Sequence, residues 1–240
     1  MKRLYFFLLL SLIIIILYII YFVDIHYILK PIKNVDIEIH DKLYNALEEL
    51  LKIFDDNEIE YIIIGGSLLG ATREKKIILW DDDIDIVILN MHNEYLEIIE
   101  KGLKKSNYYI KQNMNYSTYI VEKHTDLHLI DLFLFEKAYD ENEKKQIYRF
   151  KFPFNYKYPK EFFYNEELYP LKDYIFGKLV VKGPNNAVNY LDRTYGVDWN
   201  TNYKKWNSKT NLINILNFKN FTIFSNMINI SNFLFNWAIF

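Results

Sequence analysis

The sequence predicts an α/β fold of the α+β kind, in which a mixed β-sheet is flanked by helices and preceded by one N-terminal transmembrane helix. Three observations predict it. An uncharged apolar run of twenty residues lies near the start of the chain, at 4–23. Between residues 36 and 135, apolar spacings typical of helices alternate with short runs typical of strands. The 240 residues are enough for one domain with its own core.

The apolar run at 4–23 predicts an uncleaved signal anchor. At a rise of 1.5 Å per residue, a helix of about twenty residues spans the roughly 30 Å hydrocarbon core of a bilayer. The run is longer than the apolar part of a cleavable signal peptide, and no small-residue cleavage pattern follows it. Lys2 and Arg3 precede it, so we expect a cytosolic N-terminus and a lumenal or extracytoplasmic catalytic domain, although Lys30 and Lys33 make the charge bias small.

Composition narrows the classes of function. The chain has no cysteine, which excludes disulfides, zinc thiolates and cysteine nucleophiles. Its net charge is only −2 at pH 7, whereas domains that follow a nucleic-acid backbone usually carry a basic face. We therefore expect no nucleic-acid partner.

After the anchor, we expect a neck over residues 24–35, a catalytic domain over 36–210 and an apolar, asparagine-rich segment over 211–240. That last segment is expected to pack on the domain or lie at an interface, with a second transmembrane helix as the alternative. The domain is predicted to contain helices over 36–54, from Ser67 onward, over 93–105 and over 185–196, and strands over 58–64, 84–89, 109–112, 117–123 and 127–135.

Residues 140–176 are rich in Tyr, Phe and Lys and contain Pro153, Pro159 and Pro170. The prolines predict loops. These loops are interpreted either as surface connections with anchoring aromatic side chains or as a lid that faces the substrate.

Acidic side chains gather at the start of the strand predicted over 84–89. Asp83 and Asp85 are two residues apart, so in a strand they point to the same face, where their carboxylates repel each other. A hard divalent cation with oxygen ligands relieves that repulsion, and Mg²⁺ held this way completes its shell with substrate phosphates and water. Asp131 is a single acid in the apolar strand predicted over 127–135, and a buried acid needs a partner. We expect it to share the metal, to act as general base, or both.

A glycine turn precedes these acids. Gly65 and Gly66 follow a predicted strand and precede a predicted helix, where unobstructed backbone N–H groups favour an anion. The Ser67 hydroxyl either adds a donor or caps the helix. Arg73 and Lys75 lie between the turn and the acids and are interpreted either as phosphate contacts or as part of a solvated turn.

Four nearby side chains have less defined roles at this point. Asp81 and Asp82 either tune the field of the site, bind substrate or cap the turn. His124 and His128 are predicted to be structural, because two histidines without a third ligand are a poor zinc site.

A Gly-Gly-Ser turn followed by Asp-x-Asp is typical of nucleotidyltransferase-fold enzymes. The segment GGSLLGATREKKIILWDDDIDI, residues 65–86, resembles the signature of the LicD family, which includes fukutin and the fukutin-related protein. The strand around Asp131 and the segment YPLKDYIFGKLVVKGPNNAVNYLDRTYGVDW, residues 169–199, resemble later blocks of that family. In this chain Leu79 stands where proline is usual, and Glu74 and Lys76 replace a common histidine and glycine, but no carboxylate is lost.

The resemblance implies a nucleotidyltransferase-like sheet and a membrane-anchored phosphotransferase. Such an enzyme would move a phosphocholine-like or ribitol-phosphate-like group from a CDP-alcohol donor to a glycan hydroxyl and release CMP. Asp83, Asp85 and Asp131 would hold Mg²⁺ or Mn²⁺, and Gly65, Gly66 and Ser67 would contact phosphate. The alternatives are a nucleotidyltransferase that moves NMP from an NTP, and a non-catalytic anchored adaptor.

Overall fold

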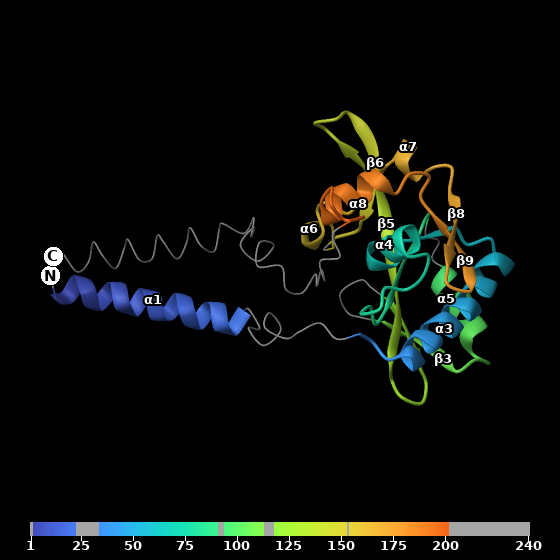
Figure 1. The fold of residues 1–240 in the computed structure, drawn as a ribbon, viewed down its shortest axis with the longest axis horizontal. Coiled ribbons are helices and arrows are strands. Elements are labelled where there is room, and N and C mark those ends of the chain that lie inside the picture. The colour runs from blue at the N-terminus through green and yellow to red at the C-terminus, as the bar shows by residue number, and fades with distance from the viewer. Residues whose placement is uncertain (1, 23–33, 91–93, 113–117, 153, 202–240) are drawn as a thin grey trace. The chain divides into compact units, whose positions relative to one another are not determined.

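The structure is a computed structural model that describes residues 2–22, 34–90, 94–112, 118–152 and 154–201 (Figure 1). The chain divides into a compact unit of residues 33–204 and a second unit that contains helix α1 (Lys2–Phe22). The predicted neck at 24–35, except for its last two residues, and the predicted segment at 211–240 lie outside the described residues.

Helix α1 includes most of the run predicted to be a membrane anchor. Among the residues that the structure describes, no helix is both long and apolar enough to cross a membrane. The anchor at 4–23 and the membrane location that depends on it therefore have no support from the structure and stay predictions.

A mixed sheet forms the centre of the compact unit, as predicted. Its strands lie in the order β1-β2-β5-β4-β3. Their bounds are β1 (Tyr61–Ile63), β2 (Ile84–Ile88), β3 (Tyr108–Gln112), β4 (Thr118–Glu122) and β5 (His128–Asp140). Strands β2 and β5 run parallel, whereas β1 with β2, β4 with β5 and β3 with β4 are antiparallel pairs. The parallel pair at the centre of the sheet brings two strand starts, and the acids on them, to the same edge.

Helices α3 (Ile37–Asp56), α4 (Gly65–Arg73) and α5 (Tyr95–Leu103) pack on this sheet, and a further helix is α8 (Val188–Tyr195). The side chain of Asp36 caps α3 by accepting a hydrogen bond from the N–H of Glu38 (3.2 Å). Helix α3 packs against α5 and β5, and α4 packs against β2. Helix α8 ends at Gly196, as predicted, and α4 begins at Gly65, two residues earlier than predicted.

The prediction of loops over residues 140–176 is wrong in part, because much of this segment forms helices and strands. It contains the end of β5 and then β6 (Lys145–Phe150), α6 (Phe154–Lys157), β7 (Phe162–Tyr164), α7 (Asn165–Leu168) and β8 (Lys172–Phe176), which pairs with β9 (Leu179–Gly183). Strand β6 pairs with β5 and β7. Two aromatic residues of this segment, Phe150 and Phe163, are at most 2% exposed. Pro159 and Pro170 lie outside the strands, as their turn signal predicts, whereas burial of aromatic side chains favours strands in the stretches beside them.

Leu47 tests the packing of α3 on the sheet. Its side chain is fully buried, so Leu47→Ala should leave a cavity and lower the free energy of unfolding by about 2–5 kcal/mol. Chemical denaturation measures this change. Ile37→Ala on the same helix is the matched control, because Ile37 is 76% exposed and its truncation should change the free energy by less than about 0.5 kcal/mol. Equal effects of the two substitutions would contradict the packing described here.

Candidate active site

Three predicted acids come together at the start of the central parallel strands. Asp85 on β2 is the register partner of Asp131 on β5, and Asp83 lies immediately before β2. Each of these partly buried residues offers a carboxylate oxygen, and the three oxygens lie within 4.8 Å of one another. The structure thus brings Asp83, Asp85 and Asp131 together, while their roles in binding metal and in catalysis stay predictions.

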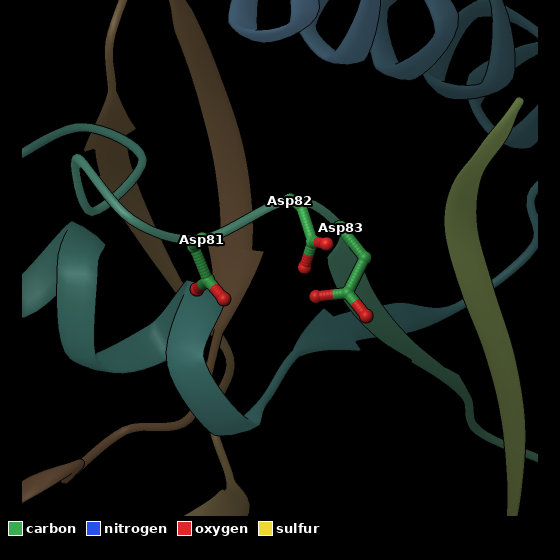
Figure 2. A group of neighbouring side chains, drawn as sticks. All are labelled: Asp81, Asp82 and Asp83. Carbon is green, nitrogen blue, oxygen red and sulfur yellow. The ribbon is translucent and has the colours of Figure 1, made fainter. Parts of the chain in front are cut away.

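Asp81 and Asp82, whose roles the sequence left open, lie on the loop that joins α4 to β2. Figure 2 shows the carboxyl groups of Asp82 and Asp83 close together, and that of Asp81 directed toward the first turn of α4. Oxygens of Asp81, Asp82 and Asp83 form a second group within 4.8 Å, and Asp82 is exposed to solvent. The buried ring of His40 fixes this loop, because its Nε2–H donates to the carbonyl of Asp81 (3.0 Å).

Burial and the neighbouring acids both shift the pKa of Asp85. Burial raises the pKa of the Asp85 carboxyl well above its ordinary value, and the negative charges of Asp83, Asp131, Asp81 and Glu161 raise it further. A carboxyl group in this position favours either a proton or a cation close by. A divalent cation shared among the acids would lower that pKa and stabilise the ionised form.

The donor set fits such a cation. Carboxylate oxygens are the ligands that Mg²⁺ prefers, at about 2.0–2.1 Å, so that two ligands of one ion lie about 3–4 Å apart. The oxygens of Asp83, Asp85 and Asp131 lie within 4.8 Å of one another, close to this spacing. The same oxygens suit Mn²⁺, which prefers similar ligands.

The glycine turn lies directly against two of the acids. Gly65 adopts a left-handed conformation (φ +55°), and a Cβ atom there would lie 2.6 Å from Oδ2 of Asp85. A Cβ on Gly66 would collide with the carboxylate of Asp81. A larger residue at either position would therefore force a carboxylate to move, and at Gly65 the positive φ would add backbone strain.

Hydrogen bonds within the protein engage two of the predicted phosphate contacts. The hydroxyl of Ser67, 1% exposed, accepts from the N–H of Asp85 (3.0 Å), and the N–H of Ile64 donates to the carbonyl of Asp85 (3.1 Å). The N–H of Gly65 donates to the hydroxyl of Tyr190 (3.1 Å). These bonds join the start of α4 to β2 and α8, so they place Asp85 relative to the turn.

Arg73 and Lys75 both form hydrogen bonds with other parts of the chain. The Arg73 guanidinium, 4% exposed, forms an ion pair with Glu74 (2.6 Å) and donates to the carbonyl of Trp199 (3.3 Å). Lys75 has a positive φ and an exposed side chain, and its carbonyl accepts from the N–H of Gly177 (2.7 Å). Glu74, which departs from the family pattern, therefore neutralises Arg73. A phosphate contact by Arg73 or Lys75 stays a prediction.

His128 was predicted to be structural, and the structure places it in contact with one of the acids. Its Nε2 lies 2.6 Å from Oδ1 of Asp131. Burial lowers the pKa of His128, but the hydrogen bond to Asp131 and the charges of Asp83 and Asp82 outweigh burial, and the net shift is upward.

Glu161 is a partly buried acid near the site that the sequence did not predict. Its Oε2 accepts from the hydroxyl of Tyr190 (2.7 Å). Burial raises the pKa of Glu161 to about 7, although the Tyr190 hydrogen bond and the charge of Lys157 act in the opposite direction. Groups within electrostatic range of Glu161 also include Asp85, Tyr158 and Tyr195. Nothing in the sequence pattern around Glu161 marked it, whereas Tyr190 and Tyr195 fall in the segment 169–199 that resembles a block of the family.

Gly65→Ala should weaken divalent cation binding at the aspartates, because the new Cβ forces the Asp85 carboxylate to move. The rise in melting temperature caused by saturating Mg²⁺ measures this effect. Gly196→Ala is the control: Gly196 also has positive φ, but a Cβ there would meet only Asp198, at 3.4 Å. Both variants should lose stability, and only Gly65→Ala should lose the Mg²⁺ effect. A full Mg²⁺ effect in Gly65→Ala would contradict the prediction.

Glu161→Gln should reduce the pH dependence of stability in the absence of divalent cations. From its ordinary value of 4.5 up to about pH 7, the folded protein keeps a proton on Glu161 that the unfolded chain releases. The free energy of unfolding therefore falls as pH rises through this window, by up to about 3 kcal/mol from this group. Denaturation at several pH values should show a smaller fall for Glu161→Gln than for the unchanged chain.

Glu166→Gln is the matched control for that experiment. Glu166 is exposed and paired with Lys145 (2.7 Å), and its hydrogen bond with that lysine lowers its pKa. Its contribution is lost only as pH falls below its ordinary value of 4.5, so this variant should keep the full fall between pH 4.5 and 7. Identical slopes for all three proteins would show that Glu161 does not titrate in this window.

Comparison with known proteins agrees with the resemblance noted above. Residues 58–186 match the family model described as the LicD/FKTN/FKRP nucleotidyltransferase domain. Uncharacterised proteins of Rickettsia typhi and Rickettsia prowazekii are each 35% identical over 153 residues, which is 64% of this chain and 45% and 53% of those proteins. The chain thus spans about half the length of these curated relatives.

Solved structures of low overall similarity were also found. A crystal structure of ANT(2'')-Ia in complex with adenylyl-2''-tobramycin has a TM-score of 0.40 at 14% identity and covers 83% of this chain and 99% of that chain. The STING-associated CdnE c-di-GMP synthase from Capnocytophaga granulosa has a TM-score of 0.33 at 15% identity and covers 79% and 62%. The family match extends over more than half of the chain and includes the glycine turn and the aspartates. The chain therefore belongs to the LicD/FKTN/FKRP family and carries its nucleotidyltransferase domain.

Proposed function

We propose that this chain is a metal-dependent phosphotransferase that moves a phospho-alcohol group from a CDP-activated donor to a hydroxyl of a glycan. The transferred group would be of the phosphocholine or ribitol-phosphate kind. The observation that carries the proposal is the meeting of Asp83, Asp85 and Asp131 against the Gly65–Gly66 turn in a member of this transferase family. Membership by itself supports a transferase, and the donor and acceptor are the proposal.

The bond changes of the proposed reaction balance without a further reactant. The acceptor oxygen forms a bond to the phosphorus that carries the alcohol, and the bond from that phosphorus to the oxygen of CMP breaks. CMP leaves with the bonding electron pair. The hydroxyl proton goes to a carboxylate of the site, for which Asp131 is the proposed acceptor. Because the reaction breaks the phosphoanhydride bond of the donor and forms a phosphodiester bond to the acceptor, with no covalent chemistry required of the protein, it depends on positioning and charge neutralisation.

The three aspartates would hold Mg²⁺ or Mn²⁺, which neutralises phosphate charge when bound. Asp85 is fixed for this role by two backbone hydrogen bonds to the start of α4. Gly66 and Lys75 are the proposed contacts to the donor phosphates. Gly65, Ser67 and Arg73 were predicted for the same role, but each has hydrogen-bond partners within the protein. We propose that these three residues hold the site in place through those hydrogen bonds.

A membrane location is part of the proposal. Residues 4–23 would anchor the enzyme beside a glycan that is assembled or displayed at a membrane, with the catalytic domain lumenal or extracytoplasmic. The support for this is the length and apolar character of the run.

Asp83→Asn and Asp85→Asn should each lower metal-dependent turnover roughly a hundredfold or more, because each removes charge that would hold the cation. The full chain in detergent would be incubated with Mg²⁺, a glycan acceptor mixture and a panel of CDP-alcohols and nucleoside triphosphates, with release of CMP and pyrophosphate followed. Asp173→Asn is the control, since Asp173 is an exposed acid paired with Lys182 (2.6 Å) away from the aspartate cluster. It should keep full activity.

The products separate the three functions considered. CMP released from a CDP-alcohol, and lost in both site variants, supports the proposal and identifies the donor. Pyrophosphate from a nucleoside triphosphate would replace it with nucleotidyl transfer. If neither product forms and Mg²⁺ does not raise the melting temperature, the adaptor is favoured.

A further inference from the structure

A short path of hydrogen bonds connects Glu161 to the glycine turn of the site. The hydroxyl of Tyr190 donates to Oε2 of Glu161 (2.7 Å) and accepts from the N–H of Gly65 (3.1 Å). Three separate parts of the chain therefore meet at one hydroxyl group: the loop before β7, helix α8 and the start of α4.

The packing around Tyr190 leaves this hydroxyl little freedom. The Tyr190 side chain is fully buried, and its ring stacks on Phe163 with ring centroids 4.4 Å apart and an interplanar angle of 10°. A tyrosine hydroxyl has one proton and two lone pairs. When that proton points to Glu161, a lone pair faces the N–H of Gly65. The acceptor on Glu161 thus sets the direction in which Tyr190 can bind Gly65.

The position of Gly65 in turn affects the position of the Asp85 carboxylate. Gly65 has φ +55°, and its Cα lies so close to Asp85 that an added Cβ would be 2.6 Å from the Asp85 carboxylate. A shift of Gly65 would therefore change the space available to that carboxylate. Asp85 is also the register partner of Asp131, so its position affects the distance between two proposed metal ligands.

We propose that Glu161 is a positioning residue of the active site, which acts through the Tyr190 hydroxyl to hold Gly65 against Asp85. The inference extends the proposed function, because the group that it positions is one of the proposed metal ligands. Glu161 itself contacts neither metal nor substrate in this proposal. A hydrogen-bond acceptor at residue 161 is what the role requires, so glutamine should replace glutamate and leucine should not.

The rate of hydrogen exchange at the Gly65 amide tests the proposal on the full chain without metal. Tyr190→Phe, which keeps the stacked ring, and Glu161→Leu should each speed exchange at Gly65 roughly two- to tenfold, the effect of losing one hydrogen bond. Glu161→Gln should stay close to the unchanged chain, because its amide oxygen accepts the same bond. This rescue separates a hydrogen-bonding role from a general loss of packing.

Tyr61→Phe is the matched control. Tyr61 is also buried, and its hydroxyl accepts from the backbone N–H of Lys182 (3.1 Å), so the variant removes the same kind of bond elsewhere in the unit. It should speed exchange at Lys182 and leave Gly65 unchanged. Titration with Mg²⁺ alone, followed by calorimetry, should show weaker binding in Tyr190→Phe and Glu161→Leu than in Tyr61→Phe and Glu161→Gln.

Unchanged exchange at Gly65 in Glu161→Leu would overturn the proposal, and so would an equal effect of Glu161→Gln and Glu161→Leu. Faster exchange without any loss of Mg²⁺ affinity, in a chain that binds Mg²⁺, would overturn the link to the aspartates. Failure of the proposed function has a different signature. In that case the unchanged chain itself releases no CMP from any CDP-alcohol, whether or not it binds Mg²⁺ and whatever the exchange at Gly65.

Discussion

Repulsion among carboxylates is the constraint on which the site depends. The fold brings one carboxylate oxygen each of Asp83, Asp85 and Asp131 within 4.8 Å of one another on an otherwise apolar part of the sheet, and burial together with the neighbouring acids disfavours the charged form of Asp85. Such an arrangement persists only where the surrounding structure holds each acid in place. Backbone hydrogen bonds to Asp85 from the start of α4, and the bond from His40 to the Asp81 carbonyl, provide that support. The repulsion among these carboxylates lowers the stability of this part of the fold, and it leaves a site that a bound cation can neutralise.

The acids and their strands could be predicted because their signals are local. Alternation along a strand puts Asp83 and Asp85 on one face, and a single acid in an apolar run marks Asp131. The parallel pairing of β2 and β5, which makes Asp85 and Asp131 neighbours, is a long-range fact that such patterns only imply. The sheet, its mixed character and helices α3, α5 and α8 were predicted for the same reason, since each has a clear apolar period.

The support of the site could not be predicted, because it depends on contacts between distant parts of the chain. Glu161 lies in a segment that its prolines and exposed lysines made look like loops, yet β6 and β7 bury aromatic rings there. Arg73 was interpreted either as a phosphate contact or as part of a solvated turn. Its guanidinium is 4% exposed, pairs with Glu74 and donates to the Trp199 carbonyl. The Gly65 amide was expected to face an anion and instead donates to Tyr190. A motif shows which residues gather at a site, whereas their partners appear only in the fold.

The distant residues that hold the site help to decide whether the chain is an enzyme or an adaptor. Tyr190 and Trp199 lie in the last block that resembles the family, far in sequence from the acids. In the structure one binds the turn beside Asp85 and the other accepts from Arg73 at the end of α4. An adaptor needs only the sheet and its core, and nothing in that role requires glycine at two positions packed against carboxylates. The acids, the turn and the distant residues that hold the turn are all present together in this family member, and this combination is our reason for proposing a transferase and not a chain that has kept only the fold.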